Sequence, residues 1–196
     1  MLRSKIMSVG LEKGFLLDLQ WHLMRGEMEQ SKKPALLLLG RILAEAGVPY
    51  ALIGGVAVQI HQSEPRTTLD IDLAVTDCGR IPREQLRAAG FAEKGHFVHS
   101  ENWVAPEGTP VQFTDDPLLA VAIARAQEVE IAGVGFRVIR RADLLHEKLR
   151  AGSDPARRRS KRLQDLADAQ ALLETDLTLT AELSAEERAI LDTLPE

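Results

Sequence analysis

The sequence predicts an α/β protein with helices at both ends, and three observations support this. Patterns with helical period come first, short strand patterns mixed with helical ones occupy the middle, and helical patterns return at the end. The chain has 196 residues, enough for one hydrophobic core with a small appendage. Its 45% apolar and 27% charged residues are ordinary for a soluble globular protein and exclude a mostly disordered, collagen-like or coiled-coil chain.

Composition also excludes several kinds of site and setting. The one cysteine, Cys78, rules out an intrachain disulfide and a cysteine-rich zinc site. No stretch carries the 18 or so unbroken apolar residues of a membrane span, so we expect no membrane association. Charged residues interrupt the apolar N-terminal stretch and no clear cleavage site follows, which indicates mature protein in a reducing, cytoplasmic setting.

The first part of the chain is predicted to form two helices. The first spans 10–25, and the second spans 31–47, with Ser31 as its cap, Pro34 in its first turn and Gly47 at its end. Apolar residues expected on one face of the first helix are Leu11, Phe15, Leu16, Leu19 and Leu23.

The middle of the chain opens with an apolar run that a glycine pair ends. Residues 50–53 predict a buried strand, Gly54 and Gly55 follow, and 56–61 predict a short helix. Residues 68–75 then alternate as a strand does. The side chains expected on one of its faces are Leu69, Ile71 and Leu73, with Asp70 and Asp72 on the other.

Shorter patterns complete the expected order of elements. The connection APEGTP predicts a hairpin, and a second hairpin surrounds a glycine-containing turn. Ser184 and Glu187 have the spacing of a capping box, which predicts a last short helix. The expected elements are a helix at 82–89, strands at 97–99, 102–105 and 110–114, paired strands at 128–132 and 135–139, and helices at 142–151 and 156–173.

Two carboxylates at i and i+2 on one strand predict a metal site. Alternation places Asp70 and Asp72 side by side, where they repel each other unless a cation neutralises them. Oxygen ligands of this kind suit Mg²⁺ or Mn²⁺, which then bind substrate phosphates as well. A D-x-D pair on a strand is often only a solvent-facing pair. The alternative is therefore that the two acids bind nothing.

Residues around the acids suit phosphate groups. Gly54 and Gly55 lack Cβ atoms, so backbone amides at a helix start can approach phosphate oxygens, and Arg66 can pair with them. A lone glycine pair is more often a simple turn. The joint order of strand, glycine pair, short helix and acid-bearing strand favours the phosphate interpretation.

This segment, ALIGGVAVQIHQSEPRTTLDIDLAV, resembles the signature of the nucleotidyltransferase superfamily with the DNA polymerase β fold. Its R-T-x-x-D-I-D-L part is similar to the AbiEii/AbiGii-toxin-like bacterial branches, whose toxin–antitoxin context depends on neighbouring genes. The resemblance implies a small mixed sheet with helices packed around it. The resemblance covers about 48–173. We expect N-terminal helices at 1–47, the nucleotidyltransferase-like core at 48–140 and a C-terminal helical segment at 141–196.

The same resemblance extends to two later segments. IRRADLLHEKL matches a helix that carries a lysine, and RLQDLAD matches a following helix that carries aspartates. It implies that Lys148 contacts nucleotide phosphates and that Asp165 lies near it. Without the resemblance, the alternative that Lys148 is a surface lysine and Asp165 an intrahelical charge is equally well supported.

One position departs from the family pattern. The resemblance implies a third carboxylate on the strand at 110–114, but the matching residue is Gln112, whose amide cannot accept a proton from a hydroxyl. Asp116 has the same strand parity as Gln112 and is our first substitute, and Asp115 is the second. The alternative is that both acids merely cap a turn before Pro117.

These expectations combine into two hypotheses of different class. In the first, the protein is a metal-dependent nucleotidyltransferase that moves a nucleoside monophosphate from a nucleoside triphosphate to an acceptor hydroxyl on RNA, a protein or a small molecule. In the second, motivated by Gln112, it is a degenerate member that binds nucleotide or a partner without catalysis. The basic run at 157–162 is either a solvated helix face or a surface for RNA phosphates. The sequence does not decide the oligomeric state.

Overall fold

The computed structural model describes residues 9–25, 31–62, 64 and 66–194. The chain forms two compact units, Met1–Ile139 and Arg140–Glu196, which we call unit 1 and unit 2 and describe separately. Among the described residues, no helix has the length and apolar content that crossing a membrane requires.

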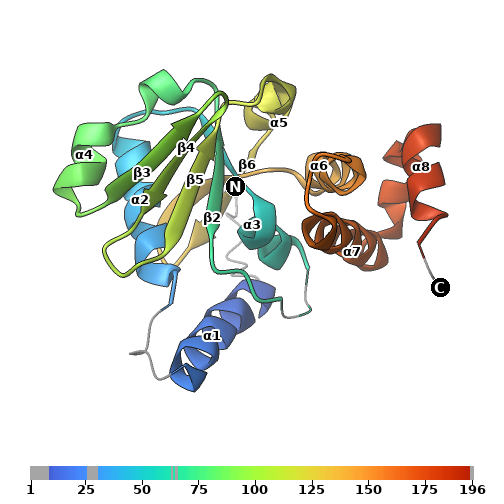
Figure 1. Cartoon of the computed structure of the whole chain (residues 1–196), viewed down its shortest axis with the longest axis horizontal. Coiled ribbons are helices and arrows are strands. Elements are labelled where there is room, and N and C mark those ends of the chain that lie inside the picture. The colour runs from blue at the N-terminus through green and yellow to red at the C-terminus, as the bar shows by residue number, and fades with distance from the viewer. Residues whose placement is uncertain (1–8, 26–30, 63, 65, 195–196) are drawn as a thin grey trace. The chain divides into compact units, whose positions relative to one another are not determined.

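Unit 1 contains a mixed seven-stranded sheet with the order β3-β4-β5-β2-β1-β7-β6 (Figure 1). β1 pairs with β2 in antiparallel and with β7 in parallel orientation, β2 pairs with β5 in parallel, and the remaining pairs are antiparallel. The prediction of a small mixed sheet is therefore confirmed. The strands are β1 (Tyr50–Ile53), β2 (Ile71–Val75), β3 (Ala92–Phe97), β4 (Ser100–Val104), β5 (Pro110–Thr114), β6 (Gln127–Ile131) and β7 (Val134–Val138).

Helices and 3-10 turns connect and cover these strands. In unit 1 they are α1 (Val9–Met24), α2 (Lys33–Glu45), α3 (Gly54–His61), η1 (Cys78–Arg80), α4 (Arg83–Ala88), η2 (Pro117–Leu119) and α5 (Ala120–Ala124). α2 packs closely on β7, because a Cβ on Gly40 would lie 2.6 Å from the ring of Phe136. α4 lies over β4, where the Arg87 guanidinium stacks on the Trp103 ring.

The two faces of the strands β2, β5 and β4 differ sharply. Ile71, Val111 and Trp103 are neighbours in register and are almost completely buried. The next row on the opposite face consists of Asp72, Gln112 and Asn102, which are exposed or half-exposed polar residues. One face of this half of the sheet is therefore core, and the other is open and polar.

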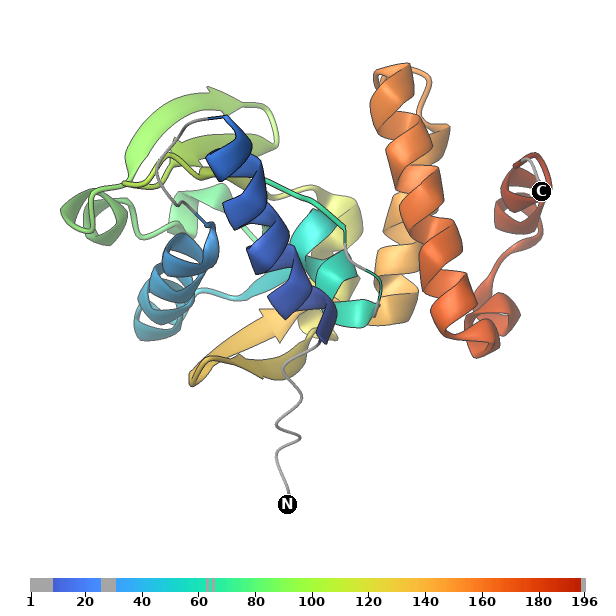
Figure 2. The ribbon, with the colours of Figure 1, turned by 90° about the horizontal axis from the view of Figure 1, so that it is seen from below.

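α1 lies alongside α3 at close range (Figure 2). A Cβ on Gly10 would come within 2.6 Å of the Gln59 carbonyl, so only glycine permits this approach. The prediction of which residues of α1 are buried is partly wrong. Leu11 and Phe15 are buried, but Leu16 and Leu23 are 61% and 53% exposed, because the contact with α3 runs along the glycine side of the helix.

Every regular element in the described part of unit 2 is a helix. The main packing contact in this unit is between α6 and α7. α8 has no buried residue. Ser184 and Glu187 form the predicted capping box at the start of α8. The elements are α6 (Arg141–Ser153), α7 (Arg159–Thr175), η3 (Leu177–Glu182) and α8 (Ala185–Leu191).

The strand boundaries differ most from prediction at β2 and β3. β2 begins at Ile71 and not at residue 68, and Leu69 is exposed, because the segment before β2 is held by side-chain contacts and not by a neighbouring strand. β3 spans 92–97 and not 97–99, and its polar and glycine residues hid it from a pattern based on hydrophobicity. η2 and α5 were missed because they are too short to show a period.

Candidate functional site

The first feature of the candidate site is the junction between β1 and α3. Gly54 starts α3 with φ +62°, a conformation that favours glycine. A Cβ at this position would overlap the Asp72 carboxylate and lie 2.8 Å from the Asp72 Cβ. The register places Ile53 opposite Asp72, which fixes this approach. Gly54 therefore leaves the space that the Asp72 side chain fills at the beginning of a helix.

Gly55 provides the same kind of space for the residues before β2. A Cβ on Gly55 would lie 2.6 Å from the Arg66 guanidinium and 2.7 Å from the Thr68 Cβ. The Thr68 hydroxyl donates a hydrogen bond of 2.8 Å to Asp70 Oδ1. The glycine pair thus brings Arg66, Thr68 and Asp70 to the start of α3, where Asp72 also lies.

A buried ion pair from the N-terminal helices supports this arrangement. Lys32 Nζ contacts Asp18 Oδ2 at 2.5 Å and donates to the Thr68 carbonyl at 2.9 Å. Burial raises the pKa of Asp18 and lowers the pKa of Lys32, although the two charges oppose both shifts and Asp70 also opposes the shift of Lys32. Lys32 therefore holds Thr68 by its backbone while Thr68 holds Asp70 by its hydroxyl.

Sequence reasoning missed Lys32, Thr68 and Asp18. Asp18 follows Leu11 and Phe15 at helical spacing, so it lies on the predicted buried face of the first helix. An acid on that face was the one sign in the sequence that Asp18 has a buried partner. Its partner lies 14 residues away, across the connection between α1 and α2, and no local pattern identifies such a pair.

The strand register places Gln112 beside Asp72, as the resemblance implied. Asn102 lies on the other side of Gln112 in the adjacent strand, so the row continues with a second amide. Amide oxygens can coordinate a cation or accept hydrogen bonds, but they cannot accept a proton at neutral pH. This row of the open face therefore carries one carboxylate and two neutral amides.

The two substitutes for the third acid have structural contacts. β5 ends at Thr114, so strand parity does not extend to Asp116 as we had assumed, and Asp116 Oδ1 accepts a 3.0 Å hydrogen bond from the Leu118 amide at the start of η2. Asp115 accepts from the Cys78 amide at 3.2 Å, and this bond contributes most to the lowered pKa of Asp115. Burial, reinforced by Asp115, raises the pKa of the Cys78 thiol to about 12.

In unit 2, Lys148 and Asp165 form part of a buried network. Lys148 Nζ contacts Asp165 Oδ1 at 2.8 Å and Asp168 Oδ2 at 2.7 Å, and all three side chains are at most 8% exposed. Arg157 Nε adds a contact of 2.8 Å to Asp165 Oδ2. The sequence reading of these residues as a surface lysine and an intrahelical charge is thus wrong, because the charges meet between α6 and α7.

A second cluster of possible metal ligands lies on β3 and β4. Among the described residues, Glu93, His96 and Glu101 bring one ligand atom each within 4.8 Å of one another. Arg83 forms a bidentate pair with Glu101, and Arg87 pairs with Glu93, whose pKa it lowers. Glu101 lies on the core face of β4, opposite the face of Asp72, so this cluster is separate from Asp72.

Two other ring-bearing side chains near these elements are packed. Trp103 is 1% exposed, and its indole donates to Glu101 at 2.8 Å, so it is a core residue. His61 is also buried, with Nε2 at 2.6 Å from the Ile139 carbonyl. Neither side chain belongs to the open polar face.

Comparison by sequence gives no relative, since no protein-family model and no curated protein matches the chain. Comparison of structures gives several. A nucleotidyltransferase-like protein from Paracoccidioides brasiliensis is 20% identical, with 81% of this chain and 91% of that chain covered and a TM-score of 0.52. The antibiotic-resistance factor ANT(2'')-Ia is 17% identical, with 82% and 91% covered and a TM-score of 0.53.

A third match is the Megavirus polyadenylate synthase. It is 13% identical and has a TM-score of 0.53, and the alignment covers 82% of this chain but 34% of the larger one. These identities are low, so the likeness concerns the fold. The mixed sheet and the helices around it therefore form a nucleotidyltransferase fold, which is the fold of this chain.

Proposed function

We propose that this protein is a nucleotidyltransferase that moves a nucleoside monophosphate from a nucleoside triphosphate to an acceptor hydroxyl and releases pyrophosphate. The observation that carries the proposal is the meeting of Asp70 and Asp72 with the glycine pair at the start of α3. The fold shared with the structural neighbours supports it.

Asp70 and Asp72 fit a divalent cation. Their carboxylate oxygens are hard ligands, and the space at Gly54 that a Cβ would fill keeps the Asp72 carboxylate at the helix start. When bound there, Mg²⁺ or Mn²⁺ would neutralise charge that develops on the phosphate oxygens during displacement. Thr68 and, through it, Lys32 would orient Asp70.

The triphosphate would lie at the N-terminus of α3. Amides at a helix start attract anions, and the absence of side chains at Gly54 and Gly55 lets phosphate oxygens approach them. Arg66, whose guanidinium lies against Gly55, would pair with these oxygens. The resemblance also implied Lys148 and Asp165 for nucleotide binding; in unit 2 both belong to the buried network, and that role stays a prediction.

The acceptor is the open part of the proposal. Its hydroxyl must lose a proton, and Gln112 cannot take it, so we assign this role to Asp116. A carboxylate has two oxygens, so Asp116 could take the proton while its Oδ1 keeps the hydrogen bond from the Leu118 amide. The names of the neighbours include an antibiotic-resistance factor and a polyadenylate synthase, so a small molecule and RNA are both reasonable acceptors, as is a protein.

A transfer assay tests the proposal. The full chain is incubated with each α-labelled nucleoside triphosphate, Mg²⁺ and total RNA or cell lysate, and the label is followed into the macromolecular and small-molecule fractions. We expect label transfer from at least one nucleotide, and its loss in the variant Asp70→Asn/Asp72→Asn. Nucleotide binding without transfer under every condition would instead support the alternative, a binding protein with a degenerate site.

A further inference from the structure

Unit 2 carries a group of cations that its own acids do not neutralise. The run from 157 to 162 contains five basic residues, and one of them, Arg157, pairs with Asp165. The other four make no salt bridge with any described residue, and three of them are exposed. We call these four the basic cluster, and its members are Arg158, Arg159, Lys161 and Arg162.

The basic cluster lies where positive charge is least favourable for the helix itself. Arg158 is the N-cap of α7, Arg159 begins the helix, and the first turn contains no acid. The amides at a helix N-terminus already carry partial positive charge, so cations there add to the same potential. The arrangement costs helix stability and produces a strongly positive surface in a chain whose formal net charge is -5.

Part of the basic cluster lines a cavity of about 410 Å³ within unit 2. Arg159 and Arg162 are its only charged lining residues, and the Nε of Arg162 is buried without a hydrogen-bond partner among the described residues. The remaining lining consists mainly of apolar side chains, with two hydroxyls. They are Gly152, Ser153, Leu163, Leu166, Ala189, Ile190 and Thr193.

These features together describe the ligand. A cavity with an apolar floor and two guanidinium groups fits a flat or apolar body that carries an anionic group. Arg158 and Lys161 do not line the cavity, so two further cations remain for neighbouring anions. A chain of phosphates with accessible bases matches both facts, whereas a single small anion would leave half of the cluster without a partner.

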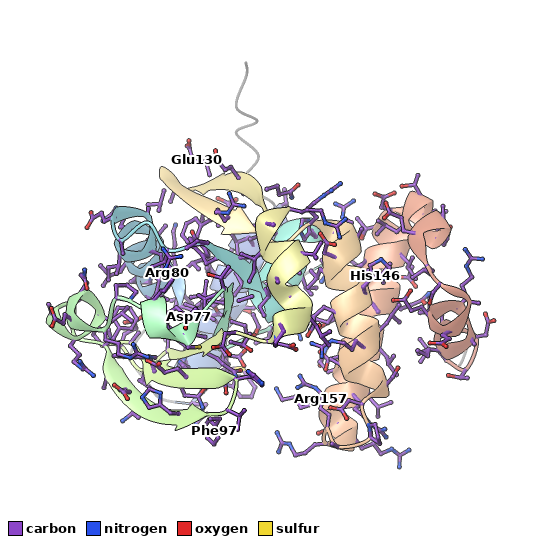
Figure 3. All side chains as sticks on the ribbon, turned by 90° about the horizontal axis from the view of Figure 1, so that it is seen from above. Asp77, Arg80, Phe97, Glu130, His146 and Arg157 are labelled. Atoms are coloured by element: carbon purple, nitrogen blue, oxygen red, sulfur yellow. The ribbon has the colours of Figure 1, made fainter. Side chains whose placement is uncertain are left out.

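We propose that unit 2 binds single-stranded nucleic acid through the basic cluster, with one nucleotide in the cavity and adjacent phosphates on Arg158 and Lys161. An unpaired strand is required because the apolar floor can only receive a base that is not already paired and stacked. Figure 3 shows Arg157 at the end of unit 2 where α6 leads into α7, so the strand would cross that end. The proposal does not depend on the proposed function, since it concerns binding in unit 2 alone.

The proposal is tested by fluorescence anisotropy on the full chain, without nucleotide or divalent cations. The probe is a labelled single-stranded RNA of about 12 nucleotides and mixed sequence, titrated at several salt concentrations. With four phosphate contacts on a single strand, a plot of the logarithm of the association constant against the logarithm of the salt concentration should have a slope of about -2.8. The variant Arg159→Gln/Arg162→Gln should bind the probe about tenfold more weakly at low salt. Because it lacks two of the four phosphate contacts, the magnitude of its slope should be smaller by about 1.4.

The matched control removes two other cations from the same unit. Arg150 pairs with Glu147 and Arg188 donates to a backbone carbonyl, and neither residue lines the cavity, so Arg150→Gln/Arg188→Gln makes the same charge change without altering the lining. This control should keep the affinity within about twofold of the native chain. Equal losses in both double variants would show a general charge effect and overturn the proposal.

Two further outcomes would also overturn it. If a 12-base-pair duplex binds as tightly as the single strand, the cavity receives no base. If vesicles with anionic lipid bind the chain while the oligonucleotide does not, the basic cluster is a membrane-binding surface. Unchanged thermal unfolding of the variants confirms that a loss of binding is not a loss of fold.

Discussion

The molecule contains two pairs of aspartates, and their surroundings differ. Asp165 and Asp168 in unit 2 are buried, and Lys148 contacts both of them within 2.8 Å. Asp70 and Asp72 in unit 1 are half-exposed at the start of a strand, next to two glycines. A buried pair that has its own lysine completes a helix interface, whereas a half-exposed pair at a helix N-terminus suits a cation and phosphates from solution. The same residue type therefore stabilises one unit and, in our proposal, serves chemistry in the other.

The largest expected effect comes from neutralising the pair in unit 1. Asp70→Asn/Asp72→Asn should reduce transfer at least about 10³-fold, because a lost metal site removes several kcal/mol of transition-state stabilisation. The melting temperature should stay the same or rise, since repulsion between the two carboxylates is relieved. Initial rates of label transfer and a thermal scan measure the two effects.

A matched control exists on another strand. Glu128→Gln/Glu130→Gln also removes two exposed acids at i and i+2, on β6. Both double variants change the charge equally, so equal losses of transfer would mean that Asp70 and Asp72 have no special role.

The next effect concerns the stability of unit 2. Lys148→Met leaves Asp165 and Asp168 buried without their main cation, which should lower the free energy of unfolding by about 3–5 kcal/mol. Chemical denaturation measures this, with Arg150→Met as the exposed control. A Lys148→Met chain as stable as the native one would show that the network does not hold α6 to α7.

The sequence predicted more of unit 1 than of the contacts that hold it. The glycine pair, the alternation around Asp72 and the register of Gln112 followed from local patterns and the family resemblance. The ion pair of Lys32 with Asp18 did not, because its members are far apart in the sequence and only the packing of α1 and α2 brings them together. Long-range polar pairs leave no period in a sequence.

Strand ends were the other weakness of prediction. Asp116 was chosen on the assumption that β5 continues past Thr114, but the chain turns into η2 before Pro117. A side chain that caps a turn and one that continues a strand can have the same sequence spacing. The role of Asp116 in proton transfer therefore stays a prediction.

A third prediction tests that role. If Asp116 is the base, Asp116→Asn should slow turnover about 10²-fold while nucleotide binding stays nearly unchanged, since a general base acts on the chemical step. Gln112→Asp, which adds a carboxylate beside Asp72, should raise the rate or rescue Asp116→Asn. Single-turnover rates and nucleotide titrations separate the two effects. Full activity of Asp116→Asn would remove Asp116 from the proposed mechanism.

The smallest expected effect compares two glycines with the same backbone conformation. Gly54 and Gly47 have φ of +62° and +61°, but a Cβ on Gly47 would meet nothing within 4 Å, whereas one on Gly54 would overlap Asp72. Each change to alanine should cost about 1–2 kcal/mol of stability from the backbone alone. Only Gly54→Ala should also weaken transfer, as measured by kcat/KM at matched thermal stability. Equal activities would show that the space at Gly54 is not needed.

The central claim is that Asp70 and Asp72 hold a divalent cation and that Asp165 and Asp168 do not. Electron paramagnetic resonance of Mn²⁺ titrated into the full chain, with a non-hydrolysable nucleoside triphosphate present, tests it most directly. We predict that the native chain immobilises Mn²⁺, that Asp70→Asn/Asp72→Asn shows only the binding of Mn²⁺ to free nucleotide, and that Glu128→Gln/Glu130→Gln behaves like the native chain. Equal immobilisation of Mn²⁺ by the native chain and by Asp70→Asn/Asp72→Asn would contradict the account.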